Sequence, residues 1–147
     1  MTLDKDHQSD WQSESVVYGC IKNVAMLDSS EHRRSNREAM LGLPSAESWS
    51  LLNREMFALT DQQCADIDLS IDVMHFGASY KGVEHEWKYW LEQFENLLRK
   101  MHWVSATVHL ETELSGLHSF VFETDGMAHD PNESSINIRC EWARDAN

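Results

Sequence analysis

Basic residues are scarce in this sequence of 147 residues: 12 Lys and Arg stand against 25 Asp and Glu, which leaves a formal net charge of −13. Phosphate backbones and anionic lipid headgroups are bound through Lys and Arg, so this deficit argues against direct contact with nucleic acid or with a membrane surface. Acidity also speeds the encounter with basic proteins. The alternative is that the charge only keeps a bacterial cytoplasmic protein in solution, and charge alone leaves both readings open.

Long apolar runs are missing as well. The first 14 residues carry one Lys and several acids, and no stretch approaches the roughly 18 apolar residues of a membrane span. Three cysteines, Cys20, Cys64 and Cys140, form an odd set without CxxC spacing, which predicts reduced thiols. We therefore expect a cytoplasmic protein without a secretory signal or a membrane segment.

Motifs that carry catalysis are also absent. The six glycines are scattered singly, so there is no phosphate-binding loop, and no Ser lies in a GxSxG turn. His109 and His118 lie near Glu111 and Glu113, but no HxH, HExxH or Cys–His cluster marks a zinc site. We expect no enzyme, no catalytic residue, no metal and no cofactor. The alternative is a cytoplasmic enzyme that uses a Glu–His pair such as Glu113 and His118, or a generic acidic adaptor protein.

Aromatic residues, by contrast, are abundant. Six Trp and five Phe can fill the core of one ordinary domain without disulfides or a metal. We expect a flexible acidic N-terminal arm over residues 1–14 and a single domain over residues 15–147. Apolar spacing predicts strands at 15–22, 67–73, 104–114, 117–124 and 136–142, and helices at 46–58 and 83–101. Capping residues before it and Gly42 and Pro44 after it predict a further helix at 31–41. This order indicates an α+β fold, a mostly antiparallel sheet of about five strands packed by about three helices.

The helix expected over residues 83–101 has the clearest pattern. Its apolar residues fall on one stripe at helical spacing: Val83, Trp87, Trp90, Leu91, Phe94, Leu98 and Met101. Such a stripe could line a groove for a ligand or partner, but an amphipathic helix must cover a sheet, which favours the core. Gly77 and Gly82 are expected to bracket the turn before this helix.

Acidic residues alternate along two of the expected strands. Asp68 and Asp72 occupy the polar positions of 67–73, and Glu111 and Glu113 those of 104–114, which predicts a negatively charged outer sheet face. The alternative is a merely solvated face. A two-residue turn at Ser115-Gly116 would pair Glu113 with His118 and add Phe120 and Phe122 to that face, whereas a three-residue turn would send both phenylalanines into the core.

Several segments together resemble a known family. They are Val17-Tyr-Gly-Cys-Ile21, His75-Phe-Gly-Ala-Ser-Tyr-Lys-Gly-Val-Glu84, Trp87, Trp90-Leu91, Phe94-Glu95 and Trp103-Val-Ser-Ala106. They look like bacterial immunity proteins that accompany polymorphic or type VI secretion toxins, often nucleases of the restriction-endonuclease fold. The resemblance is densest over residues 75–123.

The resemblance implies inhibition by binding. A nuclease presents a basic groove to its substrate, so an acidic protein suits its occlusion. We expect an immunity protein that covers the active surface of a cognate toxin, without contacting nucleic acid or membrane. The residues expected to bind the toxin are Asp68, Asp72, Glu111, Glu113, Phe120, Phe122, Glu123 and Asp125.

Overall fold

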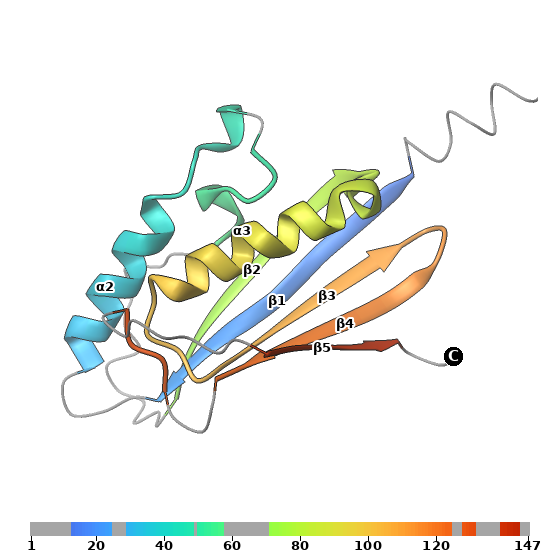
Figure 1. Cartoon of the computed structure of the whole chain (residues 1–147). Helices are drawn as coiled ribbons and strands as arrows, with labels where there is room; N and C mark the ends of the chain where they lie inside the picture. The colour runs from blue at the N-terminus through green and yellow to red at the C-terminus, as the bar shows by residue number, and fades with distance from the viewer. Residues whose placement is uncertain are drawn as a thin grey trace, which may run out of the picture.

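The chain forms one antiparallel sheet with its helices on one side (Figure 1). The structure is a computed structural model, and it describes residues 13–24, 29–48, 50–57, 71–124, 128–131 and 139–144. The sheet has the strand order β2-β1-β3-β4-β5, and every neighbouring pair is antiparallel. The strands are β1 (Glu14–Val24), β2 (Ile71–Lys81), β3 (Ser105–Thr112), β4 (Gly116–Glu123) and β5 (Arg139–Arg144).

Two α-helices, α2 (Ser29–Leu41) and α3 (Trp87–Arg99), lie on the same face of this sheet, as Figure 1 shows. Short 3-10 turns occur at η1 (Ala46–Ser48), η2 (Arg54–Met56) and η3 (Val83–Glu86), the last of which leads directly into α3. The expected α+β class with an antiparallel sheet is confirmed. The expected number of helices was too high for the described residues, which contain two α-helices and three 3-10 turns.

Strand alternation decides which side chains enter the core. Along β1, Val17 and Ile21 are fully buried while Val16 and Tyr18 are exposed. Along β3, the even-numbered residues from Ala106 to Thr112 are buried and those between them are not. The face toward the helices is therefore mainly apolar, with Ser15, Asn23 and Thr112 as buried polar residues.

Helix α3 supplies the other half of this core. Its buried residues are Trp90, Phe94, Leu97 and Leu98. The Phe94 ring lies 5.2 Å from Phe76 of β2 and 5.3 Å from Phe122 of β4, measured between ring centroids. Much of the stripe expected over 83–101 is thus packed into the core across strands that are far apart in sequence.

The helix expected over residues 46–58 was wrong. Within its described residues, 46–48 and 50–57, this segment forms η1 and η2 but no α-helix, while Leu52 and Met56 are buried. Tertiary hydrogen bonds hold it instead: Tyr80 Oη donates to the Leu51 carbonyl oxygen, and Leu52 N donates to Gln93 Oε1 at 3.4 Å. Apolar residues spaced three or four apart fit such an irregular segment as well as they fit a helix.

Strand β2 also departs from its expected pattern. Residues 67–70 lie outside the described residues, and Val73, expected in the core, is 43% exposed. Phe76 is buried instead, and the strand runs through Gly77 to Lys81. Only Gly82, with φ of 68°, forms the turn that follows. Gly77 pairs with Tyr18 inside the ladder, so the turn expected at Gly77 was wrong.

The hairpin between β3 and β4 has the three-residue register. Thr112 pairs with Gly116, so Glu113, Leu114 and Ser115 form the connection, and Gly116 adopts φ of 81°. A residue in the left-handed region is usual where such a loop ends. Leu110, rather than Glu113, lies opposite His118.

Within the described residues no helix combines the length and the apolarity that crossing a bilayer requires.

Candidate protein-binding face of the sheet

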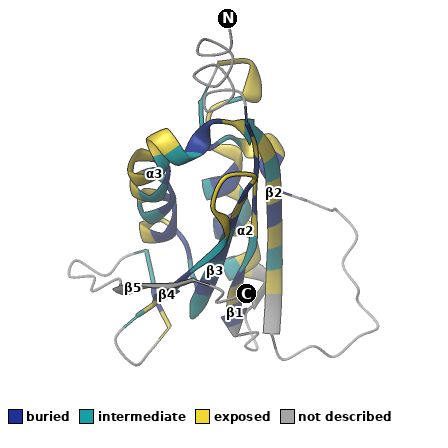
Figure 2. Cartoon of the chain, turned by 90° about the vertical axis from the view of Figure 1, so that its right-hand side faces the viewer, coloured by how far each residue is buried: buried dark blue, intermediate teal, exposed yellow. Residues whose placement is uncertain are grey.

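The outer face of the sheet is the one turned away from α2 and α3. Three large apolar side chains are exposed on it: Val16 at 39%, Tyr18 at 36% and Val73 at 43%. Figure 2 shows exposed and less exposed residues alternating along β2. Exposed apolar side chains on rigid paired strands are a feature of interaction surfaces when they occur together.

Acidic residues lie at one end of this face. Glu111 is exposed on β3, and Glu113 is exposed in the turn that follows. Glu14, at the start of β1, is also exposed, and its backbone N–H donates to Glu113 Oε1 at 3.3 Å. Lys81 lies directly opposite Glu14 on β2 and offsets part of this charge.

The structure divides the eight residues expected to bind a partner. Glu111, Glu113 and Glu123 are exposed, Glu123 at the far end of β4. Asp68 and Asp125 lie outside the described residues, and for Asp72 only the backbone, paired with Asn23, is described.

Phe120 and Phe122 were wrongly included in that set. They are 8% and 0% exposed, because the three-residue turn directs them toward α3. Phe120 contacts Trp87 with ring centroids 5.2 Å apart, and Phe122 contacts Phe94. They stabilise the core and cannot act as surface anchors.

Tyr18 lies near the middle of β1 on the outer face, between His109 of β3 and Gly77 of β2. On one side its ring lies 5.0 Å from that of His109, whose Nδ1 is 2.8 Å from Ser119 Oγ. On the other side its neighbour in the ladder is Gly77, which has no side chain. The Tyr18 ring is therefore supported from β3 and open toward β2.

Sequence reasoning missed Val16, Tyr18 and Glu14 as surface residues. The signal was present in β1, where apolar residues occupy both faces: Val16 and Tyr18 alternate with Val17 and Ile21. A strand with one solvated face has polar residues on that face. The apolar residues at both parities of β1 therefore indicated a second use for its outer face.

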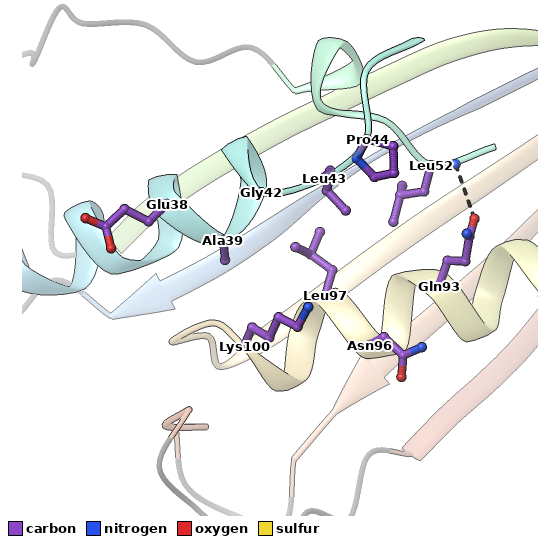
Figure 3. Close-up of a pocket in the computed structure, with 10 residues that line it drawn as sticks. All are labelled: Glu38, Ala39, Gly42, Leu43, Pro44, Leu52, Gln93, Asn96, Leu97 and Lys100. Carbon is purple, nitrogen blue, oxygen red and sulfur yellow. Dashed lines mark hydrogen bonds between the residues drawn. The ribbon is translucent and has the colours of Figure 1, made fainter. Parts of the chain in front are cut away.

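A shallow cleft of about 310 Å³ lies on the helix side, between the end of α2 and α3 (Figure 3). Its wall is mainly aliphatic, from Leu43, Pro44, Leu52 and Leu97, with Lys100 at one end and Gln93 at the other. Gln93 is already hydrogen-bonded to Leu52 N. The cleft thus combines an aliphatic lining with four polar side chains, of Glu38, Gln93, Asn96 and Lys100, and Gln93 is engaged within the fold.

Two groups with a shifted pKa contact the helices: Tyr80 contacts Trp90 of α3, and His102 contacts His32 of α2. Burial raises the pKa of Tyr80 to about 12, and the Trp90 Nε1–H bond to its hydroxyl, 3.1 Å long, only partly offsets this. Partial burial and then the nearby His32 ring lower the pKa of His102, against the opposing carboxylate of Asp130. Tyr80 is hydrogen-bonded to Trp90 and Leu51, and His102 stacks on His32. These contacts fit a role in the fold for both residues.

The pair considered for an enzyme, Glu113 and His118, is not aligned by the strand register. His118 Nε2 lies 2.9 Å from Ser115 Oγ. Among the described residues, no group of His, Cys, Asp or Glu side chains has an arrangement suited to holding a metal ion.

No protein family, curated protein or solved structure matches this chain.

Proposed function

We propose that this chain is an immunity protein that neutralises a cognate secreted toxin, a nuclease acting in the cytoplasm, by binding the toxin and covering its active surface. The observation that carries this proposal is the outer sheet face, where Val16 and Tyr18 are exposed side by side on β1 although they could have been polar at no cost to the core. A face of this kind gains stability when a partner covers it.

Charge supports a basic protein as the partner. The chain carries a formal net charge of −13, and Glu14, Glu111 and Glu113 place part of it at the end of the outer face. Complementary potentials speed the encounter and suppress wrong partners. A nuclease that binds phosphates must present Lys and Arg around its substrate groove.

Occlusion requires no chemistry from the inhibitor. A protein seated over a substrate groove excludes nucleic acid by occupying its place, and the acids replace the phosphates as partners of the toxin's cations. Strands suit this task because paired backbones hold side chains in fixed positions, so little ordering opposes binding.

Co-expression with the product of the neighbouring gene tests the proposal. We expect that gene to encode a toxin that stops growth, and this chain to restore growth and to co-purify with the toxin in a stoichiometric complex. A catalytically inactivated toxin should bind equally well, because occlusion does not depend on turnover. A neighbouring product that is harmless, or that forms no complex with this chain, would contradict the proposal.

A further inference from the structure

The outer face is chemically different at its two ends, and this difference runs along the strands. The row formed by Ser79, Val16, Glu111 and Leu117 crosses β2, β1, β3 and β4. Directly opposite residues of antiparallel strands have Cβ atoms about 4.5–5.5 Å apart. The Glu111 carboxylate therefore stands between two aliphatic side chains, Val16 and Leu117.

The next row places an aromatic ring beside that carboxylate row. Tyr18 is 36% exposed and open on its Gly77 side. Glu111 lies diagonally across the ladder from Tyr18, on β3, and diagonal neighbours about 7–8 Å apart are within reach of long side chains. A guanidinium bound at Glu111 can therefore approach the Tyr18 ring, with which a cation interacts within about 6 Å of the centroid. Carboxylate, aliphatic and aromatic groups are thus all available to one basic side chain.

The acids at this end have few internal partners. Among the described residues, neither Glu111 nor Glu113 forms an ion pair with a Lys or an Arg. Glu113 Oε1 accepts one hydrogen bond, from the backbone of Glu14, and Lys81 faces Glu14 rather than Glu111. The negative charge of Glu111 and Glu113 is left for an outside cation.

At the opposite end of the same face, the exposed apolar residue lies beside a positive charge instead of a negative one. Val73, at 43% exposure, lies directly opposite Lys22 in the ladder. Lys22 also pairs with Ser105, and the acid of that row, Glu123, is two strands away on β4. Val16 and Val73 are thus similarly exposed, but Val16 lies opposite the negatively charged Glu111 and Val73 lies opposite the positively charged Lys22.

We propose that the partner docks on the acidic end of the outer face, defined by Glu14, Val16, Tyr18, Glu111, Glu113 and Leu117. Its contacting segment presents an Arg or Lys whose cation reaches Glu111 and Glu113 and whose aliphatic stem lies along Val16 and Leu117. Arg suits this row best, because its planar guanidinium can bond a carboxylate at two points and stack on Tyr18. This assignment rests on the proposed function and specifies the surface and chemistry that it uses.

A second copy of this chain is the less suitable occupant. Each copy carries a formal net charge of −13, so two such faces meet against like-charge repulsion. A basic protein is attracted by the same charge.

The test compares two variants with the same change of charge. The first is Val16→Lys with Glu111→Lys, at the acidic end. The matched control is Val73→Lys with Glu92→Lys, which alters the other end of the face and an exposed position of α3. The binding partner is the catalytically inactivated product of the neighbouring gene, with affinities measured by calorimetry and folding checked by thermal unfolding.

We expect the acidic-end variant to lose affinity by more than about tenfold beyond the loss of the control, since it adds repulsion where charge pairs are buried. Tyr18→Ala, which leaves the charge unchanged, should also weaken binding. Equal losses in the two variants, or none in either, would overturn the surface while leaving the proposed function intact. A wild-type chain that does not bind this partner would overturn both.

Self-association is measured separately by sedimentation of the wild-type chain. We expect a monomer up to high micromolar concentration. A dimer that Val16→Lys dissociates and Val73→Lys does not would overturn the assignment, because the acidic end would then be an interface between copies.

Discussion

Gly19 occupies a position of β1 that points toward the core, and the surrounding atoms leave no room there for a side chain. A Cβ atom at this position would collide with the Thr107 carbonyl oxygen of β3 and would lie 2.9 Å from Phe76 Cζ. The oxygen belongs to the backbone, so it can move only by distorting the β1–β3 pairing. We predict that Gly19→Ala lowers the free energy of unfolding by about 1–3 kcal/mol, the usual range for overpacking a core.

Gly77→Ala provides the control for this prediction. A Cβ at Gly77 meets its nearest atom, Tyr18 Cβ, at 3.6 Å, an ordinary contact on the outer face. Denaturant unfolding of both variants should therefore show a clear loss for Gly19→Ala and a small change for Gly77→Ala. Equal stability of Gly19→Ala and the wild type would show that the two strands separate easily at this point.

Single residues also explain which parts of the binding face were predictable. The exposure of Glu111 and Glu113 followed from alternation in the sequence, because polar positions between apolar ones face water. The burial of Phe120 and Phe122 depended on whether the turn has two or three residues. Alternation is compatible with both registers, and one residue of slip moves a whole strand to the other face.

Helix α2 contributes Met40 to the core and contacts the segment after α3 through two polar side chains, His32 and Asn36. Asn36, 3% exposed, donates through Nδ2 to the His102 carbonyl oxygen at 2.9 Å and accepts from His102 N at 2.7 Å. The His32 and His102 rings stack with centroids 3.9 Å apart and planes 8° from parallel. The His32 ring is thus one of the groups that lower the pKa of His102.

We predict that this contact makes stability depend on pH. Burial, and then His32, lower the pKa of His102 in the folded chain. In the unfolded chain an imidazole has a pKa of about 6.5. As the pH falls, the unfolded chain therefore binds a proton at this position before the folded chain does. Stability contributed by the neutral ring is thus present above about pH 6.5 and is lost as the pH falls below it. Thermal unfolding between pH 7.5 and 5.5 should show the melting temperature falling.

His102→Phe tests the origin of that fall, because phenylalanine can stack on His32 without taking up a proton. The variant should have a smaller decrease in melting temperature over the same pH range than the wild type. His75→Phe, at an exposed position of the outer face, should retain the wild-type decrease. An unchanged decrease in His102→Phe would assign the pH dependence to other groups.

Elements were predictable where their pattern was long, and unpredictable where tertiary contacts decided. The 83–101 stripe was long enough to fix α3 and its buried face. The apolar pattern over residues 46–58 was shorter, and the conformation of this segment depends on Tyr80 and Gln93, which lie far away in sequence. The same holds for β2, where strand pairing with β1 continues through Gly77 although glycine favours a turn.

At the scale of the whole molecule, the large negative charge has two consequences of opposite sign. Within the chain, the 25 acids outnumber the 12 basic residues, and their mutual repulsion opposes the compact state. Between the chain and a basic partner, the same charge is attractive. Salt screens both interactions, with a Debye length of about 10 Å at 0.1 M ionic strength.

We therefore predict that added NaCl raises the stability of this chain and weakens its complex. Between low salt and about 0.3 M NaCl, the melting temperature of the free chain should increase, because repulsion between exposed acids is screened most effectively. Over the same series the dissociation constant for the basic partner should rise, mainly through a slower association rate, since long-range attraction acts before contact. Thermal unfolding and stopped-flow binding in matched buffers measure the two trends. An association rate that did not change with salt would mean that the acidic end does not guide the encounter, and that the exposed valine and tyrosine side chains are sufficient for docking.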